Sequence, residues 1–284
     1  MIVAPRLLVI NADDLGLAPG INRGIVEAYE SGTLSSASML VNTSAFEEAV
    51  ALTRSRAPRL GVGLHLNLVD GRPLARVPSL TDARIGHFHS FGELVRRVLA
   101  GRVSLADVRS ECDAQLAALV GAGIRPTHLD SHRHTHALPG VLAAVVASGR
   151  AARVRVVRRP LDRPTLANPV AAVKMLALHA AWRVALSGVT RDDRSYLARA
   201  PHFRGIVLQG SNDVHARLLA LLDRLPLGVT ELMLHPGYDD AVLGAQDPYR
   251  LERERELAAL RSTTVRERLE RGDVRLVTFA DLPN

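Results

Sequence analysis

Carboxylate and imidazole side chains recur at one kind of position in this chain, at or directly after the end of a short apolar run. The runs cover residues 7–10, 61–66, 127–129 and 231–234, and the side chains are Asp13, Asp14, His65, Asp130, His132 and His235. Such groups, brought together from different elements, bind divalent metal ions and act as general acids and bases. The lone Cys112 excludes a cysteine-based zinc site, so a metal would be held by His, Asp or Glu.

Each of these residues also has an interpretation that involves no chemistry. The adjacent carboxylates of Asp13 and Asp14 could form a turn and an N-cap, His65 could be a core histidine, and His235 could end a strand before a Pro-Gly turn. The segment 128–136, with four histidines in nine residues, could be an exposed loop. However, adjacent carboxylates repel each other unless a cation or proton lies between them, and four strand ends carry such residues together. The combined pattern therefore favours a functional site.

Strands and helices must alternate along the chain to place these residues on one face. We expect strands at residues 7–11, 35–41, 61–66, 127–130, 154–157, 206–208, 231–235 and 275–278. We expect helices at residues 20–31, 45–54, 91–100, 106–120, 139–148, 170–187, 213–224 and 248–270. This alternation predicts a parallel sheet with right-handed crossovers, and seven or eight units predict an irregular, TIM-like (β/α) barrel. The carboxyl ends of barrel strands converge on one face, where the four groups would meet.

The net charge of +7 gives little support for a nucleic-acid partner. The basic residues are spread along the chain, and the richest segment, 250–271, alternates Arg with Glu as a solvated helix face does. Aromatic residues make up only 4%, so there is no stacking platform for single strands. No secretory signal precedes the first strand, which predicts a cytoplasmic protein. The apolar stretch 170–186 is too short and too charged for stable membrane insertion, although peripheral contact remains open.

Five motifs in these same regions are the basis of a family resemblance. They are NADDLG at 11–16, Asn22 with Gly24 and Ile25, GLHLN at 63–67, PTHLDSH at 126–132 and HPG at 235–237. In order and spacing they closely resemble the YdjC-like (ChbG-type) carbohydrate deacetylases, from about residue 7 to the C-terminus. The resemblance implies a distorted (β/α) barrel related to the polysaccharide-deacetylase fold, one domain over residues 1–284, and a homodimer.

The resemblance also implies roles for individual residues. One divalent metal ion would be held by Asp14, His65 and His132, with Asp13 as general base and His235 as general acid. The residues implied near the substrate are His136, Arg158 and Asn67. Asp130, two residues before a ligand, is a candidate for orienting a ligand histidine. Two imidazoles and a carboxylate suit zinc, cobalt or nickel, whereas magnesium is often assigned in this family.

The substrate implied by the resemblance is an N-acetylated amino sugar, which would be cleaved to acetate and a free amine. An inserted loop and helix at about 159–205 are similar to the hopanoid-biosynthesis branch, HpnK, which is thought to act on an N-acetylglucosaminyl hopanoid lipid. A soluble chitooligosaccharide is also a candidate substrate, and the helix at 170–187 could instead be core or a dimer interface. The same residues would also suit a metal-dependent amidohydrolase or phosphoesterase, or a non-catalytic carbohydrate- or lipid-binding protein.

Overall fold

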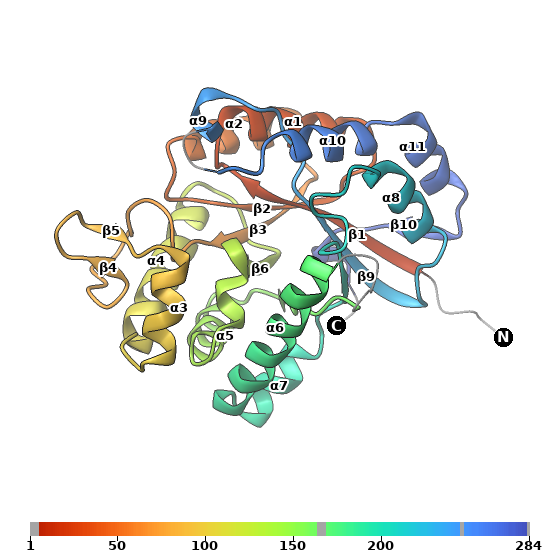
Figure 1. Cartoon of the computed structure of the whole chain (residues 1–284). Helices are drawn as coiled ribbons and strands as arrows, with labels where there is room; N and C mark the ends of the chain where they lie inside the picture. The colour runs from red at the N-terminus through yellow and green to blue at the C-terminus, as the bar shows by residue number, and fades with distance from the viewer. Residues whose placement is uncertain (1–5, 164–168, 245–246, 283–284) are drawn as a thin grey trace.

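The computed structural model of the chain describes residues 6–163, 169–244 and 247–282. One curled, parallel sheet runs through this part of the chain, with the strand order β7-β6-β3-β2-β1-β9-β8 and with β10 also paired to β1 (Figure 1). Its strands are β1 Arg6–Leu15, β2 Ser36–Met39, β3 Gly61–Leu66, β6 His128–Ser131, β7 Val156–Val157, β8 His202–Arg204, β9 Gly228–Leu234 and β10 Val274–Leu276. Because β7 and β8 end this order, the sheet forms an irregular, incompletely closed (β/α) barrel.

The first strand lies in the middle of the sheet. β1 pairs with β9 from Arg6 to Ala12 on one side. On the other side its first half pairs with β10 and its second half with β2. Val9, Ile10 and Ala12 are fully buried, as expected for a parallel strand covered on both faces.

Helices connect the strands and cover the outside of the sheet. They are α1 Pro19–Glu30, α2 Phe46–Arg56, α3 Phe91–Leu99, α4 Leu105–Gly121, α5 Val141–Ala151, α6 Pro169–Ala185, α7 Arg191–Leu197, α8 Val214–Leu222, α9 Ala241–Gly244, α10 Leu251–Leu260 and α11 Thr263–Glu270. In Figure 1, α1, α2 and α10 lie on one side of the sheet, and α3 to α7 lie on the other. A small antiparallel hairpin, β4 Thr81–Asp82 and β5 His87–Phe88, extends beside α3. None of the described helices has the length and hydropathy needed to span a membrane.

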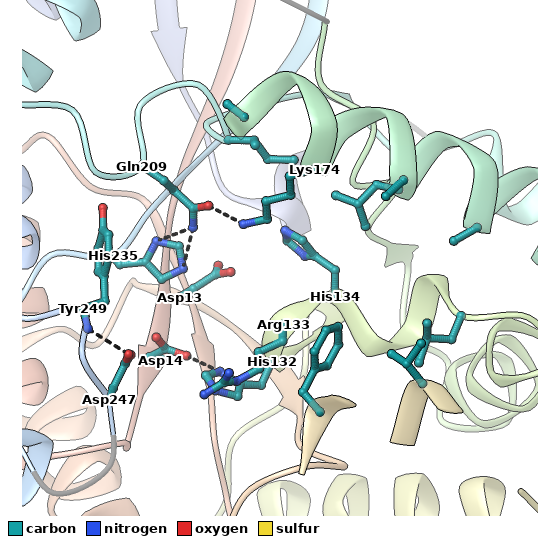
Figure 2. Close-up of a pocket in the computed structure, with 18 of the residues that line it drawn as sticks. Asp13, Asp14, His132, Arg133, His134, Lys174, Gln209, His235, Asp247 and Tyr249 are labelled. Carbon is teal, nitrogen blue, oxygen red and sulfur yellow. Dashed lines mark hydrogen bonds and ion pairs between the residues drawn. The ribbon is translucent and has the colours of Figure 1, made fainter. Parts of the chain in front are cut away.

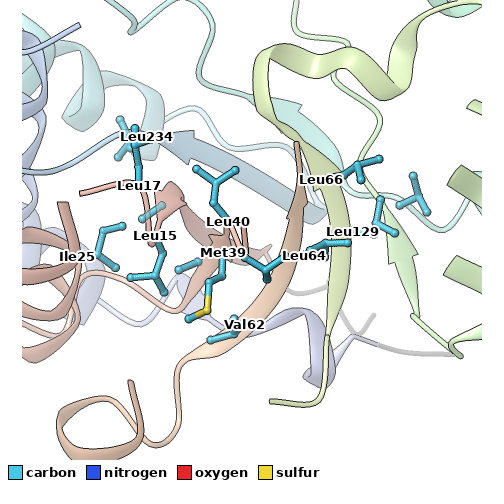
Figure 3. Close-up of a cluster of buried hydrophobic side chains, with 14 of the residues drawn as sticks. Leu15, Leu17, Ile25, Met39, Leu40, Val62, Leu64, Leu66, Leu129 and Leu234 are labelled. Carbon is cyan, nitrogen blue, oxygen red and sulfur yellow. The ribbon is translucent and has the colours of Figure 1, made fainter. Parts of the chain in front are cut away.

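The main hydrophobic core lies between the sheet and its helices (Figure 3). In β3, Val62, Leu64 and Leu66 are buried in this core and alternate with Gly63 and His65. Since successive side chains of a strand point to opposite faces, the leucines hold β3 against the helices while His65 points into the barrel. The alternating pattern of β3 therefore both anchors the strand and aims its histidine.

The β4–β5 hairpin and helices α7 and α9 were not expected from the sequence, and two expected elements are placed or divided differently. The prediction of a strand at 206–208 is wrong. The strand lies earlier, at His202–Arg204, and a turn follows it. Gly205 has a φ of +133°, and the Asp162 carboxylate accepts hydrogen bonds from the backbone N–H groups of Gly205 and Ile206. The helix expected at 248–270 is two helices, because Ser262 caps a new one by accepting from the Val265 N–H at 3.3 Å.

Candidate metal centre and active site

A bulge in β1 presents two adjacent carboxylates to the same end of the barrel. The register between β1 and β2 shifts between Ala12 and Leu15, which places Asp13 and Asp14 in the irregularity. Asp14 has a φ of 70°, in the left-handed region that non-glycine residues rarely adopt. Neighbouring side chains of a regular strand would point to opposite faces, whereas a bulge redirects one of them. Both carboxylates consequently line one cavity.

Asp14, His65 and His132 converge at the floor of this cavity. Oδ1 of Asp14 lies 2.8 Å from Nδ1 of His132 and 3.3 Å from Nε2 of His65. One donor atom from each residue lies within 4.8 Å of the other two, so the three could hold a metal ion. His132 begins a short 3-10 segment, η1 His132–Ala137, in which Arg133 and His134 also have positive φ values.

The electrostatics of this trio suit a cation. Burial opposes ionisation of Asp14, but the Arg253 guanidinium and His132 hold the pKa of its carboxyl well below the usual range. Burial likewise opposes protonation of His65, but Asp130 and Asp13 raise the pKa of its imidazole to about 10. The pKa of His132 is raised, against its burial, by Asp14. A divalent ion would replace these protons as the partner of the Asp14 carboxylate.

Asp130, a candidate for orienting a ligand histidine, contacts His65. Its Oδ1 lies 2.7 Å from Nδ1 of His65, which leaves Nε2 directed at Asp14. Its Oδ2 accepts from the Ser38 hydroxyl at 2.7 Å, and Ser38 also contacts the buried His128. Gly63 makes room for this arrangement, because a Cβ there would lie 2.5 Å from the His128 ring and from its carbonyl oxygen.

Arg158 lies beneath the site and joins three carboxylates. Its Nη1 and Nη2 donate to the two oxygens of Asp13 at 2.6 and 2.7 Å, a bidentate pair. Nη2 also lies 2.7 Å from Asp130, and Nε donates to Glu231 at 2.6 Å. The Arg158 side chain is fully buried, and burial raises the pKa of Glu231 to about 7 despite this ion pair.

Arg158 also decides between two possible ligand sets. Asp13, His65 and Asp130 form a second group with donor atoms within 4.8 Å of one another. In that group both carboxylates already bind the Arg158 cation. Among the described residues, Oδ1 of Asp14 contacts the two imidazoles alone, while its Oδ2 binds Nη2 of Arg253 at 2.7 Å. The geometry therefore favours the set that contains Asp14.

His235 follows β9 and faces the two aspartates across the cavity (Figure 2). Its backbone N–H donates to Glu256, and its ring lies against Tyr249 with centroids 5.7 Å apart. The amide nitrogen of Gln209 lies 3.4 Å from Nδ1 of His235, and the amide oxygen accepts from Lys174 at 2.6 Å. Burial lowers the pKa of His235 to about 4, against the attraction of Asp14, so its ring is uncharged at neutral pH.

The cavity that contains these groups has a volume of about 970 Å³ and two chemically different parts. Asp13, Asp14, His65, His132 and His235 form the polar floor. Away from that floor, the wall is formed by apolar side chains of α3, of α6 and of the residue after η1, which include Val95, Leu99, Leu138, Ala177, Leu178, Ala181 and Val184. The site thus joins a set of ionisable groups to a long apolar surface.

Three residues expected near the substrate lie elsewhere. Asn67, His136 and Arg158 are buried, and none of them lines the cavity. Asn67 closes the turn that leads to Asp70, by accepting from the N–H groups of residues 69 and 70. His136 lies 2.6 Å from the Ser131 hydroxyl and 3.0 Å from the Arg158 carbonyl oxygen. From these positions the three residues can support the residues of the site, but they do not face a ligand in the cavity.

Several residues of the site were not identified from the sequence. The segment 250–271 was interpreted as a solvated face, but Arg253 and Glu256 are about 1% exposed and belong to the site. They lie in phase with the buried Leu257 and Leu260, and this helical spacing was the available signal. Glu231 lies four residues before His235 on the same face of one strand, which is a comparable signal. We find no sequence signal for Gln209.

Comparison with known proteins gives consistent matches over nearly the whole chain. The family model described as YdjC-like protein matches residues 7–271. A carbohydrate deacetylase from Geobacillus stearothermophilus is 35% identical over 98% of both chains. A chitooligosaccharide deacetylase from Serratia marcescens is 32% identical over 98% of this chain and 99% of its own. A solved structure from Enterococcus faecalis V583 is also similar, and its protein is named for cellobiose-phosphate cleavage. The two sequences are 27% identical, and the match covers 97% of this chain and 98% of the other with a TM-score of 0.76.

Proposed function

Because the chain belongs to the YdjC-like family, we propose that it is a metal-dependent deacetylase of N-acetylated amino sugars. The observation that carries this proposal is the convergence of Asp14, His65 and His132 on one point, with Asp13 beside them on the same cavity floor. The reaction adds water to the acetyl carbonyl carbon and breaks the C–N bond, which yields acetate and a free amine.

The metal would be held by Asp14, His65 and His132, which offer one carboxylate and two imidazoles. This mixed oxygen and nitrogen donor set suits zinc, cobalt or nickel better than magnesium, which prefers oxygen ligands. When bound, such an ion polarises the acetyl carbonyl and lowers the pKa of a water molecule. Asp130 keeps His65 in the orientation that this role requires.

Asp13 is proposed as the general base that takes a proton from the attacking water. Its carboxylate is held by Arg158 on both oxygens and by the Asn11 amide at 2.8 Å, so its position is fixed. A positioned base of this kind contributes about 10²–10⁴-fold to the rate. Because each carboxylate oxygen can accept more than one hydrogen bond, these contacts leave Asp13 able to accept the proton.

His235 is proposed to deliver a proton to the leaving nitrogen. Its ring is uncharged at neutral pH in the free protein, because burial lowers its pKa to about 4. The proton must therefore enter the site during the reaction, and the proton that Asp13 takes from water is the one available. Gln209, held by Lys174, directs its amide N–H at the ring and fixes the position of the imidazole.

The cavity wall supports an apolar carrier for the sugar. A chitooligosaccharide presents hydroxyl groups along its length, and the wall beyond the catalytic floor offers Val95, Leu99, Leu178 and Val184 instead. Burying apolar ligand surface against such a wall is favourable by roughly 25 cal/mol per Å². We therefore propose that the N-acetylglucosaminyl group is borne on a lipid, and that a hopanoid is the carrier.

Acetate release by metal-stripped protein tests the proposal. Zinc, cobalt, nickel or magnesium would be added back, with diacetylchitobiose and an N-acetylglucosaminyl hopanoid as parallel substrates and Asp13→Asn as the inactive control. We expect metal-dependent release, fastest from the lipid-linked sugar. Release from the soluble sugar alone would refute the lipid carrier, and release from neither with metal bound would refute the deacetylase proposal.

Metal stoichiometry distinguishes a deacetylase from a phosphoesterase, since many phosphoesterases use two metal ions. Because Arg158 occupies the second carboxylate group, we expect one equivalent per chain by elemental analysis. Two equivalents would favour the phosphoesterase. The homodimer, the cytoplasmic location and the boundaries of the insertion at about 159–205, of which 164–168 lie outside the described residues, remain predictions.

A further inference from the structure

Helix α6 is apolar around most of its circumference, including the side that faces solvent. Its inner side is buried at Met175, Trp182 and Ala185. On its outer side, Val173 and Leu176 are 68% and 61% exposed. A helix that is apolar all round is normally covered on every side. The outer side of α6 is therefore a surface that requires a partner.

Helix α3 continues this surface across the cavity. Phe91, Val95 and Leu99 recur every fourth residue on one face of α3, and all three line the cavity opposite α6. Leu99 on α3 and Val184 on α6 are 74% and 56% exposed, whereas Asp13 and Asp14 at the floor are 1% exposed. The exposed ends of both helices therefore lie at the cavity mouth. We call Phe91, Leu99, Val173, Leu176 and Val184 the α3–α6 rim.

The charges on these two helices are mostly positive. The only carboxylate on them is Glu93, and it is paired with Arg96 and Arg97 on the same helix. Helix α6 adds the exposed Arg183 and carries no acidic residue, while its Lys174 lies in the cavity against Gln209. Arginine binds phosphate groups through several N–H donors, and an apolar surface edged by basic residues is typical of helices that lie on anionic membranes.

We propose that the α3–α6 rim docks on an anionic lipid surface, so that the cavity mouth opens into the bilayer interface. The proposal rests on the proposed lipid-linked substrate, because such a substrate is dissolved in a membrane. The apolar cavity wall is continuous with the rim through Leu99 and Val184, so a carrier can pass from lipid to cavity along one apolar path.

A second copy of the chain fits this surface less well. Leu99 and Val184 belong both to the rim and to the cavity wall, so a protein partner seated there would close the mouth of the active site. It would also bring two sets of like charges together, since α6 carries no acidic residue to pair with Arg183 of a second copy. Lipid phosphates, in contrast, complement this charge.

The test measures vesicle binding of the whole protein without substrate, so its outcome does not depend on the proposed activity. Sedimentation would compare vesicles of phosphatidylglycerol mixed with phosphatidylcholine and vesicles of phosphatidylcholine alone. The variants are Val173→Glu and Leu176→Glu, neither of which lines the cavity. The matched control is Val120→Glu, a valine 55% exposed at the far end of α4.

We expect the wild type and Val120→Glu to bind the anionic vesicles and to release them as salt rises. Val173→Glu and Leu176→Glu should bind roughly tenfold or more weakly, because a charge replaces apolar surface in the interface. Both should keep wild-type acetate release from a soluble sugar. Equal binding by all variants, or no binding by the wild type, would overturn the proposal, as would a wild-type dimer that Val173→Glu converts to a monomer.

Discussion

Replacing Arg158 with methionine should cost the protein a large part of its stability. Arg158 makes contacts of 2.6 to 2.7 Å to Asp13, Asp130 and Glu231, all fully buried. Removing one partner of a buried ion pair costs about 3–5 kcal/mol, out of a total of about 5–15 kcal/mol for a folded domain. For a chain of this size, that loss lowers Tm by roughly 5–8 °C.

The loss should also depend on pH in a defined direction. Without Arg158, Glu231 loses the guanidinium that opposes the effect of burial, so its folded-state pKa rises further above that of the unfolded chain. Burial already raises the pKa of Glu231 to about 7 with Arg158 present. Groups with a raised folded-state pKa lose stability as pH rises through that pKa. The Tm difference between wild type and Arg158→Met should therefore be larger at pH 8 than at pH 5.

Differential scanning calorimetry at both pH values provides the measurement, and Arg268→Met provides a matched control. Arg268 is also buried, but its partners Asp223 and Asp273 are 57% and 45% exposed. Its ion pairs should be worth only about 0–1 kcal/mol. The reasoning is refuted if Arg158→Met lowers Tm no more than Arg268→Met does, or by the same amount at both pH values.

Four further predictions concern the base, the metal ligands and the packing beneath them. Asp13→Asn should reduce acetate release by about 10²-fold or more with metal content unchanged, and near wild-type turnover would show that Asp13 is not the base. His132→Ala should lose the metal by elemental analysis; an unchanged content would move the ligand to another histidine. Because the pKa of His65 is raised to about 10, its ring is protonated in the metal-free protein at neutral pH. Zinc binding should therefore release a proton from His65 and tighten as pH rises, and calorimetry in buffers of different ionisation enthalpy can detect that release. Gly63→Ala should cost about 1–3 kcal/mol in urea unfolding, since its methyl group would lie 2.5 Å from the His128 ring and carbonyl oxygen, and a wild-type midpoint would contradict this close packing.

The sequence predicted the meeting of the site residues because that meeting follows from strand direction. Asp13, His65, His132 and His235 each lie at or near the carboxyl end of an apolar run, and parallel strands bring such ends together. Asp130 was a candidate for orienting a ligand histidine, and in the structure its carboxylate lies 2.7 Å from His65. These inferences needed only the period of the strands and the direction of the sheet.

The remaining contacts of the site could not be predicted, because they join residues that are far apart in the sequence and leave no local sequence pattern. The bulge that turns Asp14 towards Asp13 arises from pairing with β2, which is distant in sequence. Arg158 was expected to contact substrate, but a guanidinium surrounded by three carboxylates from other strands is held by them instead. Arg253 was assigned to a solvated face because its neighbours in sequence alternate in charge, and its true partner, Asp14, lies 239 residues away.

The position of β1 has a consequence for how the protein is made. On a ribosome the strand with Asp13 and Asp14 emerges long before two of its three sheet partners, β9 and β10. The cations that neutralise these aspartates, Arg158 and Arg253, also come late. Until then β1 can pair only with β2, and its two carboxylates lack the cations that neutralise them in the folded protein, so the centre of the sheet cannot form during most of translation. The nascent chain exposes aggregation-prone apolar surface until β9 and β10 have been synthesised. We therefore expect the yield of folded protein in cells to depend on chaperones that shield β1.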